Sequence, residues 1–158
     1  MANDKALRQH LLNTLKGNDA HVNFDAAIKN IPANIRGQRL NGAEHSPWEV
    51  LEHLRITQRD ILDFSRKANH KSPDFPGGYW PNTQAPPSEK AWEQSVQAFR
   101  GDLEALCELV ANPTTDLFAT VPSGDSQTVL REALLAADHN AYHLGELVLV
   151  RRLLGAWQ

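Results

Sequence analysis

The segment TVLREALLAADHNAYHLGELVLVRRLL, residues 128 to 154, decides how the rest of the chain is interpreted. Its composition favours one long helix, from Thr128 to Leu154. Within it His139 and His143 stand four residues apart, which places them ~40° apart around a helix of 3.6 residues per turn. Both imidazoles can therefore reach one point in space, which is how a helix offers two ligands to one metal ion.

The two histidines share a face of this predicted helix with mostly apolar residues, so we expect them to point into the core. That face carries Glu132, Leu135, Ala136, Leu147, Val150 and Leu154. Buried imidazoles need partners, because unsatisfied polar groups are costly inside a protein. A metal ion would satisfy both, and so would neighbouring carboxylates, carbonyls or waters; the spacing alone leaves these alternatives open.

The opposite face of the same helix is apolar as well. Its stripe consists of Leu130, Leu134, Ala137, Ala141, Leu144 and Val148. A helix that is apolar on both faces is buried on both. We expect a homodimer interface to cover this stripe, with packing under the long loop or under the N-terminal segment as the alternative.

Length and charge limit the class of protein. A chain of 158 residues fits one domain, residues 1–158, with a sizeable core. The net charge of -3 and the lack of a basic run argue against a nucleic-acid partner. A single Cys suits a reducing cytoplasm, and no leader or membrane-length apolar run is visible. We expect a cytoplasmic protein that acts on a small molecule.

Three further helical regions precede the last helix, which predicts an all-α fold. Residues 4–31 read as one kinked helix or two short ones. Ser46-Pro47 with Glu49 is a helix start, and that helix extends to about Lys67. A third helix begins at Ser88 and carries an unbroken apolar stripe to about Ala111. The expected architecture is a four-helix bundle.

The segment from Asn69 to Pro87 is the one long loop that the sequence predicts, and it is rich in Pro, Gly and aromatic residues. Extended at up to ~3.3 Å per residue, it can run the ~30 Å length of a twenty-residue helix, so the helices on either side of it can be parallel. Tyr79 and Trp80 either form a lid over a pocket or pin the loop to the bundle. We favour the second interpretation.

A third histidine leans inward from the second helix. His53 lies within roughly 40° of Asp60 at the edge of that helix's apolar arc. Together with His139 and His143 it gives three imidazoles on two helices, a set that binds Zn(II), Ni(II) or a similar ion and leaves positions open for water or substrate. Such ions lower the pKa of a bound water or thiol.

Carboxylates near this set are the candidates for acid-base or supporting roles. Glu146 lies one turn beyond His143, and Glu132 lies two turns before His139. We take Glu146 and Asp60 as the candidate catalytic residues, with orientation of the imidazoles as the other role for Glu146, Glu132 and Asp60. Cys107 has no neighbouring base to activate it, and we expect a passive thiol.

Three stretches closely resemble the DinB-like superfamily of damage-inducible four-helix-bundle metalloproteins. They are residues 48–55 (WEVLEHLR), residues 60–64 (DILDF) and residues 130–145 (LREALLAADHNAYHLG). The resemblance covers nearly the whole chain. It implies a bundle with an up-down-down-up course and a long crossover loop between its second and third helices. It also implies a divalent metal, often nickel or zinc, on His53, His139 and His143.

What the resemblance implies about activity is less specific. Relatives often form dimers, and some are transferases or isomerases that use a low-molecular-weight thiol. Where this chain has Glu146, relatives often carry Gln. Our first hypothesis is a metal-dependent enzyme, either a thiol-dependent transferase or a small hydrolase. The alternatives are a non-catalytic, metal-stabilised bundle with a stress or regulatory role, and three histidines that are ordinary polar groups of the core.

Overall fold

The computed structural model describes residues 2–40 and 42–157, and this part of the chain is helical. Its five α-helices are α1 (Ala2–Lys16), α2 (Phe24–Ile28), α3 (Pro47–Arg66), α4 (Glu89–Ala111) and α5 (Val129–Leu153), and two 3-10 turns are η1 (Ala33–Ile35) and η2 (Gly77–Tyr79). The extended structure found among these residues is one isolated bridge between Thr120 and Thr128. The predicted all-α class is confirmed.

The long helices begin where capping side chains predict. Ser46 forms a capping box with Glu49 at the start of α3, with Pro47 in the first turn. Ser88 and Thr128 accept backbone N–H groups at the starts of α4 and α5. Each cap satisfies donors that the first turn of a helix leaves without a partner. These starts agree with the sequence analysis.

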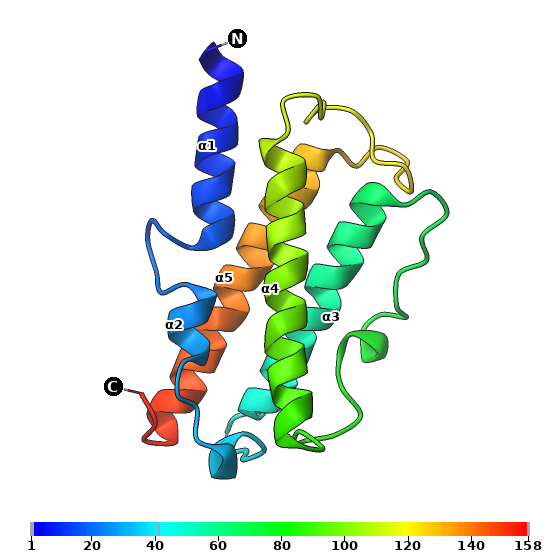
Figure 1. Ribbon diagram of the computed structural model, residues 1–158. Helices are drawn as coiled ribbons and strands as arrows, with labels where there is room; N and C mark the ends of the chain where they lie inside the picture. Colours follow the sequence, from blue (N-terminus) through cyan, green and yellow to red (C-terminus); the bar gives the residue numbers. More distant parts are fainter. Residues whose placement is uncertain (1, 41, 158) are drawn as a thin grey trace.

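The helices pack side by side, as Figure 1 shows. α3 and α4 run in the same direction, and α1 and α5 run in the opposite one. The segment between α3 and α4, residues 67–88, returns along the outside of the molecule and is called the crossover loop below. α3 packs against both α4 and α5, so residues far apart in sequence face each other between α3 and α5.

The N-terminal region consists of two separate helices. The chain leaves α1 at Gly17, whose φ of 64° is a left-handed conformation that glycine adopts at little cost. Leu11 and Leu15 of α1 belong to the same apolar cluster as Ala137 of α5. In the same way, α2 covers Leu144 and Val148, which lie in the cluster with Phe24, Ala27 and Ile28.

The second apolar stripe of α5 is therefore covered mainly by the chain's own N-terminal helices, which is the alternative that the sequence left open. Leu134 is the exception, because 51% of its surface is exposed. The homodimer stays a prediction.

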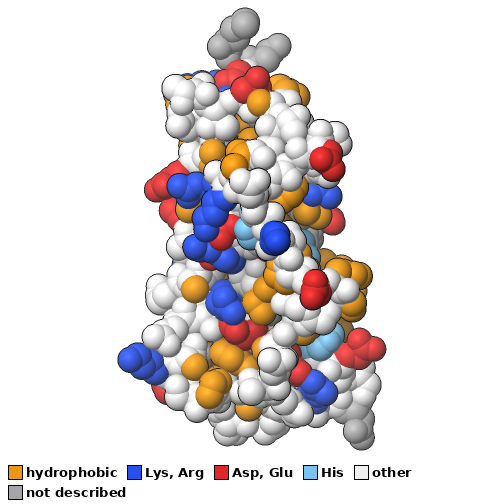
Figure 2. Space-filling view, turned by 90° about the vertical axis from the view of Figure 1, so that its right-hand side faces the viewer, with side chains coloured by type: hydrophobic (Ala, Val, Ile, Leu, Met, Phe, Trp, Pro, Cys, Tyr) orange, Lys and Arg blue, Asp and Glu red, His pale blue; other side chains and the backbone are white. Residues whose placement is uncertain are grey.

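The surface of the molecule is chemically mixed. On the side that carries α3 and the crossover loop, basic and acidic side chains lie next to each other, and histidine side chains reach the surface at separate places (Figure 2). Charged side chains of α3 form pairs, such as Arg59 with Asp102 and Arg55 with Glu52. None of the helices in the described part of the chain is long and apolar enough to cross a membrane.

Candidate metal centre

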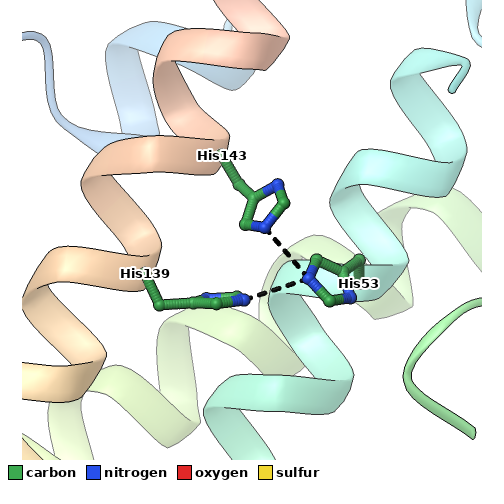
Figure 3. A group of neighbouring side chains, drawn as sticks. All are labelled: His53, His139 and His143. Carbon is green, nitrogen blue, oxygen red and sulfur yellow. Dashed lines mark hydrogen bonds between the residues drawn. The ribbon is translucent and has the colours of Figure 1, made fainter. Parts of the chain in front are cut away.

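Three histidine side chains converge between α3 and α5. His53 projects from α3, and His139 and His143 project from neighbouring turns of α5 (Figure 3). The Nε2 atom of His53 lies 3.0 Å from Nε2 of His139 and 3.0 Å from Nε2 of His143. One ligand nitrogen from each residue falls within 4.8 Å of the others. The sequence predicted this set, and the packing of α3 on α5 brings it together.

The hydrogen bonds on the far side of two of these rings fix where their protons lie. Nδ1 of His53 donates to the carbonyl oxygen of Tyr79 at 2.8 Å, and Nδ1 of His143 donates to the carboxylate of Glu146 at 2.8 Å. A carbonyl or a carboxylate only accepts. In the neutral state, Nε2 of both His53 and His143 must therefore carry a lone pair.

These two lone pairs face each other at 3.0 Å. Two acceptors at that distance repel each other unless a proton or a cation lies between them. Nitrogens bound to one zinc ion lie ~2.0–2.1 Å from it, so two ligands of the same ion are about 3 to 3.5 Å apart. The separation and the tautomers of His53 and His143 thus fit a shared divalent ion.

His139 differs from the other two members. Its Nδ1 atom is buried and has no hydrogen-bond partner among the residues that the structure describes. Glu132, one of the three carboxylates that the sequence suggested for orienting the imidazoles, is instead bonded to Arg131 at 2.8 Å. Its tautomer is therefore not fixed by a protein acceptor, and Nε2 of His139 can either donate to His53 or bind an ion.

Burial keeps His53 and His139 neutral, as metal ligands must be. Burial is the main cause that lowers the pKa of His139 to about 4, and the neighbouring His143 and His53 lower it further. Burial also lowers the pKa of His53, and it outweighs the opposing hydrogen bond to the Tyr79 carbonyl. At neutral pH these two imidazoles offer lone pairs rather than positive charges.

The crossover loop supplies part of the site. The carbonyl of Tyr79 holds His53, as described above, and the indole of Trp80 stacks on the His53 ring with centroids 4.0 Å apart and planes 4° apart. Trp80 also stacks on His45 at 3.7 Å. Tyr79 and Trp80 therefore pin the loop to the bundle, as the sequence analysis favoured, and they do so at the triad.

Asp60 anchors this loop. Its carboxylate accepts hydrogen bonds from the Tyr79 hydroxyl at 2.7 Å and from Nε2 of His70 at 2.6 Å. Both donors belong to the crossover loop. Asp60 thus reaches the triad through Tyr79, whose hydroxyl it binds and whose carbonyl holds His53; its catalytic role stays a prediction.

Glu146 bridges two imidazoles. One carboxylate oxygen binds His143, and the other accepts a hydrogen bond from Nδ1 of His45 at 2.9 Å. Burial by itself would raise the pKa of Glu146, but the hydrogen bonds from His143 and His45 hold this pKa below its ordinary value. The carboxylate is therefore ionised at neutral pH and complements the electron-poor side of a metal-ligating imidazole.

Sequence reasoning missed His45 and the roles of the Tyr79 carbonyl and the Trp80 ring. His45 directly precedes the helix start at Ser46, in a connector with no periodic pattern. A backbone carbonyl has no sequence signature at all. The signal that could have drawn attention to His45 is its place directly before the capped start of α3.

Cys107 lies in the core, away from this site. It is 2% exposed, and burial raises the pKa of its thiol to about 11. The thiol is therefore protonated and shielded at neutral pH, which agrees with the passive role predicted for it.

The comparison with protein families identifies the chain. The model of the DinB superfamily matches residues 18–147, so the chain belongs to this superfamily. The matched region contains the three histidines and Glu146. Searches against curated proteins and against solved structures gave no match.

Proposed function

We propose that this member of the DinB superfamily is a metal-dependent enzyme. It binds one divalent metal ion through His53, His139 and His143 and uses this ion in catalysis. The observation that carries the proposal is the 3.0 Å approach of Nε2 of His53 to Nε2 of His143, with an acceptor bonded to Nδ1 of each ring, so that both Nε2 atoms of the neutral rings can bind one ion. Imidazole donors favour zinc, nickel or a similar borderline ion.

The donor set supports an open site of the catalytic type. Three protein ligands leave at least one coordination position for water or substrate, whereas structural zinc sites close all four positions with protein ligands. A divalent ion in such a site acts as a Lewis acid and lowers the pKa of a bound water or thiol. A thiol-dependent transferase and a small hydrolase both use this chemistry.

The residues around the triad hold its imidazoles in fixed orientations. The Tyr79 carbonyl and the Glu146 carboxylate orient two of the ligands, and the Trp80 ring covers His53. Both oxygens of Glu146 accept hydrogen bonds from imidazoles, which favours an orienting role for this residue over the role of a base. The directions of α1, α3, α4 and α5 support the up-down-down-up four-helix bundle that we infer for the domain (Figure 1).

Metal content is the first test. Protein expressed with zinc and nickel available and then freed of loosely bound metal should retain about one ion per chain by elemental analysis. His139→Ala should lose it, because two imidazoles bind far more weakly than three. His21→Ala is the matched control, since His21 is exposed and its ring bonds the carbonyl of its neighbour Val22.

Activity decides between the two main alternatives. The enzyme hypothesis predicts turnover in a panel of thiol-conjugation and ester-hydrolysis reactions, and loss of that turnover in His139→Ala. A metal-loaded protein with a large gain in melting temperature and no turnover across the panel would instead support a metal-stabilised bundle with a stress or regulatory role. A wild-type protein without metal would contradict both.

A further inference from the structure

A fourth histidine lies next to the triad without belonging to it. His45 stands directly before Ser46, the residue that caps α3, and its side chain is 22% exposed. Its Nδ1 atom donates to Oε1 of Glu146 at 2.9 Å, while Oε2 of the same carboxylate binds His143 at 2.8 Å. We propose that His45 is a positioning residue of the metal centre, which holds Glu146 in the orientation that His143 requires. This inference rests on the proposed metal site.

The reason lies in the freedom of a glutamate side chain. Glu146 is half-buried on α5, three residues after His143, and has three rotatable bonds before its carboxylate. A hydrogen bond from His143 alone fixes one oxygen and leaves the carboxylate plane free to turn. The second bond, from His45, fixes the other oxygen. The chain His45–Glu146–His143 therefore sets both the tautomer and the ring orientation of the ligand.

His45 is itself held from two sides. It is attached to the rigid start of α3, where the fully buried Ser46 closes the capping box and also donates from Oγ to the carbonyl of Gln84 at 2.6 Å. Its ring stacks on Trp80, with planes 12° apart. Because Trp80 also stacks on His53, His45 touches the supports of two different ligands: Glu146 behind His143 and Trp80 over His53.

The hydrogen bond and the stacking are separable by substitution. His45→Phe keeps a flat ring against Trp80 and removes the donor to Glu146. His45→Asn places an amide N–H close to where Nδ1 of the imidazole was and removes most of the ring. His21→Phe is the matched control, a histidine exchanged for the same residue at an exposed site away from the triad.

The readout is metal affinity, measured with Zn(II) or Co(II) in competition with a chelator. Loss of a partner that orients a metal-ligating histidine typically lowers affinity 10–100-fold. We expect His45→Phe to bind at least about tenfold more weakly than the wild type, with the same stoichiometry. His45→Asn should stay within about threefold of the wild type, and His21→Phe should be unchanged.

A double-mutant cycle separates positioning from a general loss of structure. Glu146→Gln offers only one acceptor oxygen, so it cannot serve both imidazoles. If His45 acts through Glu146, adding His45→Phe to Glu146→Gln should cause little further loss. Circular dichroism of each variant confirms that it is folded.

The outcomes distinguish this inference from the proposed function. Wild-type affinity in His45→Phe, a loss in His45→Asn as large as in His45→Phe, or full additivity in the double variant would each overturn the role of His45 and leave the triad standing. Absence of metal binding in the wild type would overturn both.

Discussion

The crossover loop, residues 67–88, and the α4–α5 connection, residues 112–128, are the long links that follow α3 and α4, and they are attached in different ways. The α4–α5 connection buries two apolar side chains, since Leu117 and Val121 are 1% and 2% exposed and lie in the core. Arg8 also donates to the carbonyls of Asn112 and Thr115 in it. The crossover loop is held largely by polar and stacking contacts, through Tyr79, Trp80 and His70.

The difference separates stability from function. Burial of apolar side chains such as Leu117 stabilises the fold without placing any group at the triad, so the α4–α5 connection serves the fold. The directional contacts of Tyr79 and Trp80 in the crossover loop are made with His53 and Asp60, so this part of the loop serves the site. Substitutions in the first link should lower stability and spare metal binding, and substitutions in the second should weaken metal binding at a smaller cost in stability.

The largest effect is expected for Leu117→Ala. Removing a fully buried leucine side chain typically costs about 2–5 kcal/mol of unfolding free energy. Denaturant unfolding should show a loss in this range, while the folded protein keeps its metal affinity. Phe118→Ala is the neighbouring control: Phe118 is 66% exposed, so the change should stay within about 0.5 kcal/mol. A lower metal affinity in folded Leu117→Ala would contradict the separation of the two links into one for stability and one for the site.

Trp80→Ala should act mainly on the site. It removes the ring that stacks on both His53 and His45, so we expect about a tenfold loss of metal affinity in chelator competition. Phe75→Ala removes an aromatic ring from the same loop that is 88% exposed, and it should change nothing. Equal affinities in the two variants would show that the loop does not support the triad.

Tyr79→Phe should have a smaller effect. It deletes the hydroxyl that donates to Asp60 and keeps the backbone carbonyl that holds His53. Loss of one such hydrogen bond costs about 1 kcal/mol, measurable by denaturant unfolding, and metal affinity should fall only a few-fold. Tyr142→Phe, at a tyrosine that is 73% exposed, is the control. A full loss of metal in Tyr79→Phe would mean that the hydroxyl, and not the carbonyl, matters to the site.

The smallest effect is a change in titration. Burial, assisted by the hydrogen bond to Asp60 and by its charge, raises the pKa of Tyr79 to about 12. Because the folded-state pKa lies above the unfolded value of ~10, this group stabilises the fold below pH 10 and loses that contribution as pH rises towards 12. Ultraviolet titration of Tyr142→Phe, which leaves Tyr79 as the sole tyrosine, measures this pKa. Asp60→Asn in that background should lower it, and an unchanged value would argue against the Asp60 contact.

The fold was largely predictable because its signals are local. Capping residues at Ser46, Ser88 and Thr128 and the apolar periodicity after each of them predict where α3, α4 and α5 begin. The pattern did not decide what covers the second apolar face of α5. That depends on where α1 and α2 pack. Many different apolar surfaces could cover the same stripe, so the stripe alone does not identify its partner.

The candidate site was predictable only in part. His139 and His143 are four residues apart on one helix, so their spacing carries a signal, and the family motif adds His53. The groups that hold these three imidazoles in place have no such signal in the sequence. His45 lies 101 residues from Glu146 in sequence, and the acceptor for His53 is a backbone carbonyl 26 residues away, in a loop.

The sequence by itself determined the helices, their caps, the family and the three imidazoles, because each of these depends on residues close together in the chain or on a recognisable motif. The tertiary structure alone decided which ring nitrogen of His53 and of His143 carries the proton, and which groups hold these two rings in place. Tautomers depend on hydrogen-bond partners, and here those partners come from the crossover loop, from the start of α3 and from α5. The last helix therefore presents the ligands, and the packing around it makes them a site.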